Sequence, residues 1–501
     1  MKNIRYKLIV FLLIPLLAFM GCEESFEEIN ENPNGSTDVP PDFLVSEAMI
    51  LISAIKVQTM DNNGAIWAQQ YGPNNTLTPF RVDDYDVAEV SNWSGNLTFN
   101  LYLGASKNLD LAFLLAGENG DTIQQGQIRI LQAFNFHFLT DAFGDTPVKE
   151  AGNFNILYPD YDAQEDIYPY LITLLDEGID LINNGGGLAL GDGDLVFGGD
   201  TENWIRFANS LKLRILMRMS YATDVSSQLS AFLAESPIFI EENSQNALFA
   251  YYEQLTNSNL YWRTWDNFGD AFGAWERANG QRVRQLWMSL GEPLVDIMND
   301  LEDPRLGAYG DRPPGFDEYV GNPVGGAALA PAAERTTLSL FFIRSTMPDI
   351  WMTASETHLL LAEAYKRGLA NGDENIAFQE GVAASMDFYD ISPNPKYIIS
   401  DSAKTAYLAS LPDVSLLSAD EGTKEIQLQQ YIALFGNGTE AWAHVRRTDW
   451  PEIPVPTNAP IGQMIARYPY DIDELNANPN APQSQSLIDQ NMWFDVPNPT
   501  N

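Results

Sequence analysis

The chain has 501 residues, 45% of them hydrophobic, and 68 acidic side chains against 28 basic ones give it a formal charge of −40. This excess of carboxylates excludes nucleic acid as a partner, because phosphate neutralisation needs lysine and arginine, and it repels the body from anionic lipid surfaces. The single cysteine excludes an internal disulfide, so the hydrophobic core alone must stabilise the fold.

The N-terminal segment has the order of a secretory signal. Basic residues precede an apolar stretch over 8–20, which is too short to span a bilayer. Gly21 then precedes Cys22, at the position of a lipid-acceptor thiol. We therefore predict a signal peptide over 1–21 and acylation of Cys22, which would hold the body durably at a membrane. An ordinary signal peptide with a chance cysteine is the alternative.

Beyond this signal, the pattern predicts one large helical body. Residues 22–40 are acidic and rich in Asn and Pro, as in a tether with an irregular segment, and 41–501 form the body. Apolar residues recur at helical spacing near 97–115, 128–144, 167–185, 204–215, 353–364 and 428–435. Helices in antiparallel pairs predict a mainly α fold with a TPR-like scaffold of helical hairpins, although no clean repeat is visible.

Between the helical parts, residues 251–348 form a long aromatic segment rich in Gly and Pro, without a long helix or strong strand alternation. We expect this region to supply loops. A capping box is predicted where the helices resume, with Thr353 as the N-cap and Glu356 as its partner.

Motifs of known catalytic or metal sites are missing from the sequence. The three histidines, His137, His358 and His444, are far apart and lack metal-ligand spacing. The sequence therefore predicts no enzyme, no cofactor and no metal site. Residues 191–200 resemble part of a calcium loop but lack its closing glutamate, so a turn is favoured and calcium stays open.

Six segments carry a resemblance to a known family. They contain, in chain order, Glu28–Asn34, Leu139–Pro147, Gly199–Arg214, Asp303–Leu306, Glu356–Ala364 and Glu440–Asp449. In this order, behind a lipoprotein signal, they resemble the SusD/RagB family of Bacteroidetes outer-membrane lipoproteins, particularly its SusD-like branch. His358 and His444 depart from the family pattern, which affects the subfamily rather than the family.

The resemblance implies a nutrient-capture protein, anchored by lipid to the outer membrane at the cell surface. Such proteins bind oligosaccharides, or in some relatives peptides, and pass them to a TonB-dependent transporter of the SusC type. The implied fold has TPR-like units on one side and a loop-rich ligand-binding side. A lipid-tethered glycan hydrolase or a purely structural adaptor is the alternative.

Polar residues in these segments have a structural interpretation. Arg206 and Arg214 interrupt an apolar helix and can pair with acids such as Glu363. Arg446 and Arg447 are expected to act as forks for carboxylates. We therefore interpret these segments as stabilising the fold and expect the ligand site in loops.

Two loop regions have the composition of a sugar site, because sugars stack their C–H faces on aromatic rings while amides and acids order the hydroxyls. The predicted ligand-binding residues of the first region are Trp67, Tyr71, Asn74, Tyr85 and Trp93. Those of the second region are Tyr261, Trp262, Trp265 and Trp275. For any single ring a core or transporter-facing position is the alternative.

Overall fold

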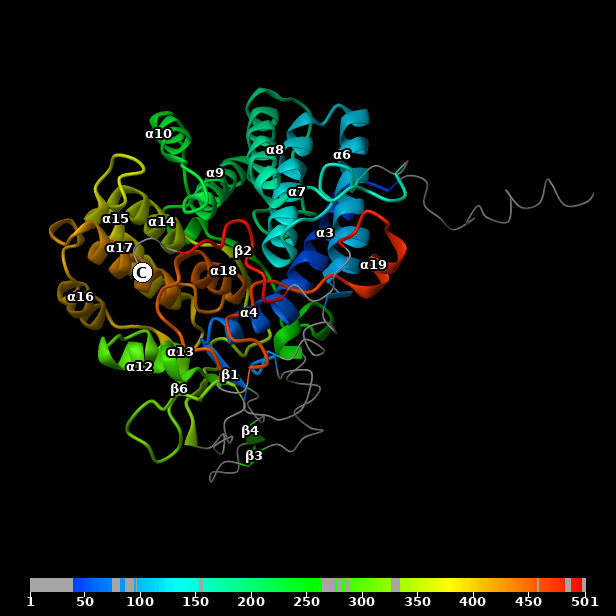
Figure 1. Cartoon of the computed structure of the whole chain (residues 1–501). Helices are drawn as coiled ribbons and strands as arrows, with labels where there is room; N and C mark the ends of the chain where they lie inside the picture. The colour runs from blue at the N-terminus through cyan, green and yellow to red at the C-terminus, as the bar shows by residue number, and fades with distance from the viewer. Residues whose placement is uncertain are drawn as a thin grey trace, which may run out of the picture. The chain divides into compact units, whose positions relative to one another are not determined.

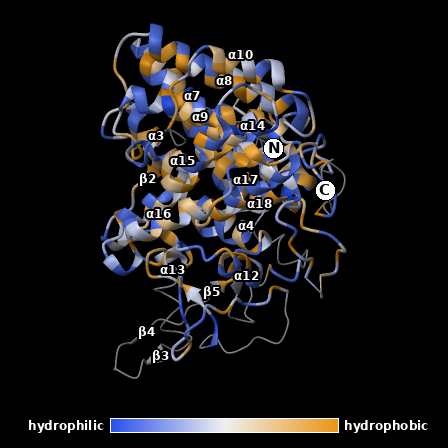
Figure 2. Ribbon diagram, turned by 90° about the vertical axis from the view of Figure 1, so that its left-hand side faces the viewer, coloured by the Kyte–Doolittle hydropathy of each residue, from blue (hydrophilic) through white to orange (hydrophobic). Residues whose placement is uncertain are grey.

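Helices form most of the protein, as the periodicity predicts, and the mainly α fold class is confirmed. The computed structural model describes residues 39–73, 82–85, 94–95, 97–152, 156–263, 275–276, 282–283, 288–325, 334–456, 459–482 and 488–497. The elements from Pro41 onward belong to one compact unit. Figure 2 shows apolar and polar positions on the same helical ribbons, as expected for helices that bury one face.

The first described helix runs without interruption through three parts: α3 (Pro41–Ile55), a π-helical segment η1 (Lys56–Met60) and α4 (Asp61–Trp67). By length and composition the stretch 41–67 could cross a membrane, but 56% of its most apolar window is buried inside the protein. Contacts of α3 with α6, and of α4 with α18, make it a core helix of this unit.

Helices of the N-terminal half pack side by side (Figure 1). A π-helical segment η2 (Phe99–Ser106) leads into α6 (Lys107–Asn119), followed by α7 (Thr122–Phe143), α8 (Gln164–Asn184), α9 (Thr201–Met219) and α10 (Ser226–Ala234). The α7–α8 hairpin is closely packed because Gly126 and Gly178 face each other: a Cβ built on Gly126 would lie 2.6 Å from the Gly178 carbonyl oxygen.

The C-terminal half contains further paired helices. They are α12 (Glu292–Asp300), α13 (Leu306–Tyr309), α14 (Ala354–Lys366), α15 (Glu374–Asp387), α16 (Asp401–Ser410), α17 (Ala419–Ala433), α18 (Gly438–Thr448) and α19 (Ile472–Ala477). Helix α14 packs against α15, α17 and α9, which joins the two halves.

The N-terminus of α14 shows half of the predicted capping box. Thr353 caps the helix by accepting the Glu356 N–H at 3.2 Å. The Glu356 side chain pairs with Arg214 instead of returning to the cap, because two charge-assisted bonds from one guanidinium outweigh the single backbone bond that the cap would offer. A complete capping box starts α17, between Ser418 and Glu421.

Strands are short in the described residues. One antiparallel sheet has the order β1 (Tyr71–Pro73), β5 (Met288–Leu290), β7 (Thr337–Leu338), β6 (Gly310–Asp311). Two-stranded sheets pair β2 (Ala247–Phe249) with β8 (Asp349–Met352), and β3 (Trp275–Glu276) with β4 (Arg282–Val283). Because Tyr71 lies opposite Leu290, this pairing draws the end of α4 towards the predicted loop-rich segment 251–348.

Candidate functional site

The two predicted aromatic regions meet at one small cavity. Tyr71 from β1 and Tyr261 both line a space of about 40 Å³, together with Asn62 and Asp349. The structure therefore places one residue from each predicted region beside the other. The Tyr71 ring also packs edge-on against Phe435, with ring centroids 5.3 Å apart.

A buried charge cluster lies beside this cavity. The Lys56 ammonium contacts Asp61 at 2.6 Å and Asp349 at 3.0 Å. Burial lowers the pKa of Lys56, but Asp349 and Asp61 outweigh burial and raise it. Burial raises the pKa of Asp61 to about 6, although Lys56 opposes the shift. Asp61 also accepts two hydrogen bonds from Thr439, so the cluster ties α4 to α18.

A larger cavity of about 270 Å³ lies against the segment 249–263. Its lining combines the rings of Tyr251 and Tyr252 with Asn257 and Arg263. Tyr252 is 57% exposed, so its ring is accessible. Tyr251 is held by a hydrogen bond of 2.8 Å between its hydroxyl and that of Ser53 on α3. Rings beside an amide and a guanidinium provide both stacking and hydroxyl recognition.

One short piece of chain separates the two cavities. Asn259 and Tyr261 line the smaller cavity, whereas Leu260 and Arg263 line the larger one. Asn259 fixes this piece, because its amide donates to the Met347 carbonyl at 2.8 Å and its oxygen accepts the backbone N–H of Trp262 at 3.0 Å. The segment therefore forms a wall of both cavities.

Sequence reasoning missed Tyr251, Tyr252 and Asn257. The signal was present, since the Tyr251–Tyr252 pair opens the aromatic segment that the sequence assigns to loops. The second predicted region starts at Tyr261, nine residues after the exposed ring of Tyr252.

Three of the predicted ligand residues, Trp67, Tyr71 and Tyr85, are buried in the core instead. Trp67 has no exposed surface: its ring packs against Trp442 and Tyr468, with centroids 4.6 and 4.9 Å apart, and its Nε1 donates to the Val82 carbonyl. Tyr85 is equally buried, and its hydroxyl donates to the sulfur of Met464. The ring faces of Trp67 and Tyr85 are not available to a ligand, because both side chains fill the interior.

Other predicted residues lie at the edge of what the structure describes. Trp262 is half-buried beside Tyr261. The backbone of Trp275 pairs with Val283 in the β3–β4 hairpin. Outside the described residues lie Cys22, Asn74, Trp93, Trp265 and the side chain of Trp275.

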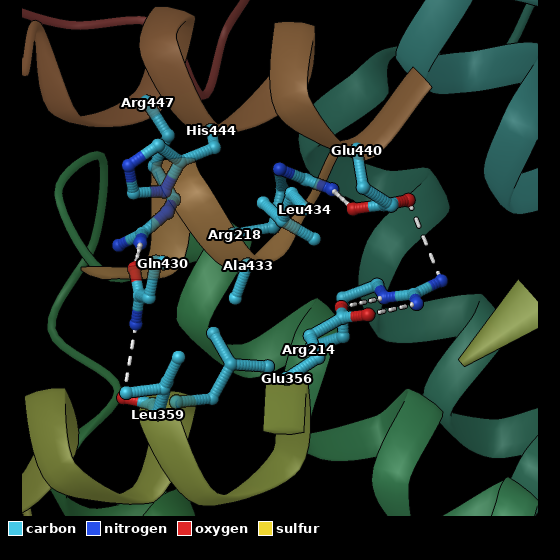
Figure 3. Close-up of a pocket in the computed structure, with 11 residues that line it drawn as sticks. Arg214, Arg218, Glu356, Leu359, Gln430, Ala433, Leu434, Glu440, His444 and Arg447 are labelled. Carbon is cyan, nitrogen blue, oxygen red and sulfur yellow. Dashed lines mark hydrogen bonds and ion pairs between the residues drawn. The ribbon is translucent and has the colours of Figure 1, made fainter. Parts of the chain in front are cut away.

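The family-like segments form a separate buried network of charges (Figure 3). Arg214 on α9 holds Glu356 with two hydrogen bonds of 2.6 and 2.7 Å. On the neighbouring helices, Arg447 holds Glu363 with bonds of 2.7 and 2.6 Å. Arg218 pairs with Glu440. The enclosed space is about 30 Å³, which is water-sized, so the network stabilises the fold and offers no ligand pocket.

Two expected partners of this network differ from the prediction. Arg214 pairs with Glu356 rather than Glu363, two helical turns earlier on α14. Arg446 holds no carboxylate: its Nη1 donates to the carbonyls of Asp141 and Ala466, and its guanidinium lies 3.4 Å from the centroid of the Trp442 ring. Burial lowers the pKa of Arg446 to about 10.

One buried group, His137 with Asp141 and Glu440, has the ligand types of a metal site. Arg218 contacts Asp141 at 3.2 Å and also pairs with Glu440, and Arg214 lies 3.4 Å from Glu440. These guanidiniums already neutralise the carboxylates, so the group lacks the negative charge that a cation needs. Burial lowers the pKa of His137.

The segment that resembles a calcium loop is a turn. Both carboxylate oxygens of Asp194 accept N–H groups, from Val196 and Phe197 on one side and from Gly199 and Trp204 on the other. Asp200 caps α9 by accepting the Asn203 N–H. These oxygens are used by the protein itself, which favours the turn over an ion site.

A helical scaffold that carries an aromatic cavity on a loop-rich segment is typical of a binding protein. The model of the SusD-like family, described as starch-binding and associating with the outer membrane, matches residues 33–471. The chain therefore belongs to this family, as the sequence motifs predict, and is an outer-membrane protein of the cell surface.

Solved structures support the fold. A chitin-binding protein superposes with a TM-score of 0.76 at 23% identity, covering 91% of this chain and 100% of the other. A SusD-like protein from Bacteroidetes gives 0.73 at 24% identity, with 92% and 100% covered. A SusD homologue from Bacteroides fragilis gives 0.71 at 20% identity, with 91% and 99% covered. No curated protein matches the chain.

Proposed function

We propose that the protein captures oligosaccharides at the cell surface for uptake and does not turn them over. Membership of a family described as starch-binding supports a glycan ligand, and the likeness to a chitin-binding protein points the same way. The observation that carries the proposal is the cavity of about 270 Å³ beside the exposed Tyr252 ring, on the segment that leads into the predicted aromatic loop.

The chemistry of this cavity suits a sugar chain. The Tyr252 ring offers a face for the C–H surface of a sugar, while Asn257 offers both an amide donor and an acceptor for hydroxyls. Arg263 already donates to the Thr256 and Ser258 carbonyls, which orients its guanidinium. We propose that Trp262, Trp265 and Trp93 extend this platform.

Calorimetry with starch and chitin oligosaccharides tests the proposal. Each stacked ring contributes about 0.5–1.5 kcal/mol beyond its area burial, so Tyr252→Ala, Trp262→Ala, Trp93→Ala and Trp265→Ala should each weaken binding, the largest effects by about tenfold. Phe316→Ala removes a ring of similar exposure, 45%, from a segment that lines neither cavity and serves as the control. Full affinity in all four variants would reject this site, and binding of peptides without any glycan would assign the protein to peptide uptake.

We further propose a SusC-type TonB-dependent transporter as the partner, with Cys22 as the lipid anchor. A binding body has no route of its own across a membrane, so uptake needs a barrel. Crosslinking in cells followed by gentle detergent extraction should recover the protein with a large outer-membrane barrel. Recovery of the free protein alone would contradict the partner while leaving glycan binding in place.

A further inference from the structure

The motif Asp141–Pro147, which is part of the family-like segment Leu139–Pro147, has no role in the site described above. Its second half instead forms one wall of a cavity of about 350 Å³, a size within the range of about 300–1,000 Å³ that is usual for ligand sites. Phe143, Thr146 and Pro147 line it. No residue of this lining is shared with the cavities beside 249–263.

The motif makes this wall rigid. Gly144 adopts a φ of +84°, which ends α7 and turns the chain. Asp145 then accepts the first N–H of α8, from Gln164, at 2.9 Å, and its carbonyl accepts the Tyr470 hydroxyl at 2.7 Å. Thr146 bridges to Asp162 through two backbone hydrogen bonds. This wall of the cavity is therefore fixed by the bonds of the motif to Gln164, Asp162 and Tyr470.

The apolar part of the lining combines four aromatic rings with Leu103, Ile156 and Leu157, and two of the rings, Phe143 and Tyr470, are themselves buried. Phe143 stacks on Tyr470 at 5.9 Å with 13° between the ring planes, and Tyr161 meets Tyr470 edge-on at 5.6 Å. The Tyr102 hydroxyl shares a hydrogen bond with Thr146. Tyr102 and Tyr161 are half-buried, so their remaining surface faces the cavity that they line.

The polar part of the lining contains both acceptors and donors. Asp471 and Glu474, at the start of α19, supply carboxylates, and Lys107 supplies an ammonium. Glu474 accepts the Tyr161 hydroxyl at 3.2 Å through one oxygen, and Asp471 caps α19 through one oxygen. Since acceptors and a cationic donor line the same cavity, its polar chemistry suits a neutral ring with several hydroxyls better than an ion.

We infer that this cavity is a second carbohydrate site, which holds the end of a sugar chain while the aromatic segment 249–263 holds another part or another chain. A cavity of about 350 Å³ has room for a short sugar, whereas the exposed Tyr252 ring offers a face to one part of a longer chain. The inference rests on the proposed glycan binding and adds a second site built by the motif.

The test measures binding of disaccharides, maltose and N,N′-diacetylchitobiose, by calorimetry. Thr98→Trp and Ala151→Trp fill the cavity from two different walls and should each lower the affinity for the bound disaccharide by tenfold or more. Leu188→Trp adds the same bulk at a side chain that is 69% exposed and lines none of these cavities, so it should change nothing. Circular dichroism and melting temperature report folding, and either filling variant suffices if the other fails to fold.

Other outcomes separate this inference from the proposed function. If maltohexaose or chitohexaose binds but neither disaccharide does, or if both filled variants bind disaccharide as the wild type does, the second site is rejected and glycan capture stands. If no sugar binds, both fall. Tighter binding of deacetylated than of acetylated chitobiose, abolished in Asp471→Asn/Glu474→Gln, would assign the cavity to cations and also reject the inference.

Discussion

The carboxylate of Glu363 on α14 links three helices, because it accepts hydrogen bonds from side chains of α17 and α18. It accepts two bonds from Arg447, one each from Gln427 and Gln430, and one from Arg367. Burial raises its pKa, but Arg447 and Arg367 outweigh burial and hold the pKa far below its usual range. The charge is therefore retained in the interior, where it offsets the guanidinium of Arg447.

Replacing Glu363 by glutamine should destabilise the protein strongly. The change leaves Arg447 buried without a counter-charge, which typically costs about 3–5 kcal/mol. Urea unfolding followed by circular dichroism measures this loss. Glu202→Gln removes a carboxylate from an exposed ion pair with Arg206, so its cost should stay below about 1 kcal/mol. Equal stability of the two variants would contradict the role assigned to Glu363.

His444 should make the fold sensitive to mild acid. Burial, with Arg447 adding to it, lowers the pKa of His444 from 6.5 to about 3. Between pH 6.5 and 3, His444 therefore binds a proton in the unfolded chain but not in the folded protein. Stability is complete above pH 6.5 and falls towards pH 3, by up to about 1.4 kcal/mol per pH unit.

The measurement compares unfolding free energies of the wild type and His444→Gln between pH 7 and 4.5. Groups common to both proteins cancel in the difference, including Asp61 with its pKa of about 6. The wild type should lose stability relative to the variant as the pH falls. Parallel curves would show that His444 does not carry this effect.

At this scale, the sequence predicts which residues are charged inside the fold but not which pair with which. Arg214 and Arg447 were both expected to bind acids, and they do. Glu356 and Glu363 are two turns apart on α14, and only the crossing of α9, α14 and α18 decides which one each arginine reaches. That crossing depends on tertiary packing, which no local pattern encodes.

At the scale of the elements, helices α4 and α18 cross closely, with a glycine from each helix at the contact. A Cβ on Gly64 would lie 2.3 Å from the Gly438 carbonyl oxygen, and one on Gly438 would lie 1.9 Å from the Asp61 carbonyl oxygen. Both helices can approach only because neither glycine has a side chain.

Alanine at Gly438 should therefore force the helices apart. Overpacking of this kind costs about 1–3 kcal/mol, and the displaced helix also carries Thr439, which bonds Asp61. Thermal unfolding should show a lower melting temperature for Gly438→Ala. Gly462→Ala is the matched change, because a Cβ there meets nothing within 4 Å; an equal shift in both would argue against the close crossing.

The helix 41–67 explains the main error in the predicted site. Its apolar pattern changes phase at the π-helical segment Lys56–Met60, and polar residues such as Asn62 and Asn63 are buried within it. A search for a constant helical period does not find such an element, so the sequence assigned Trp67 to a loop. The aromatic content of a segment predicts rings but does not distinguish a buried ring from an exposed one, such as that of Tyr252.

For the whole molecule, attachment to the membrane is expected to depend on one thiol. The whole chain has a formal charge of −40, so anionic lipid repels it and it should not stay on a membrane without its anchor. Cys22→Ala should therefore move the protein to soluble fractions, as immunoblotting of fractionated cells would show. Unchanged membrane fractionation with an unprocessed N-terminus would contradict the predicted lipidation.

The ion pairs of the interior also determine how early the fold can be completed during synthesis. Arg214 pairs with Glu356, which is synthesised 142 residues later, and Arg218 pairs with Glu440, which is synthesised 222 residues later. Until the ribosome has made α18, an early chain holds unmatched charges that oppose burial. We therefore expect the helices to pack completely only after α18 has been made, and an incompletely folded chain is the form that a secretory channel can transport.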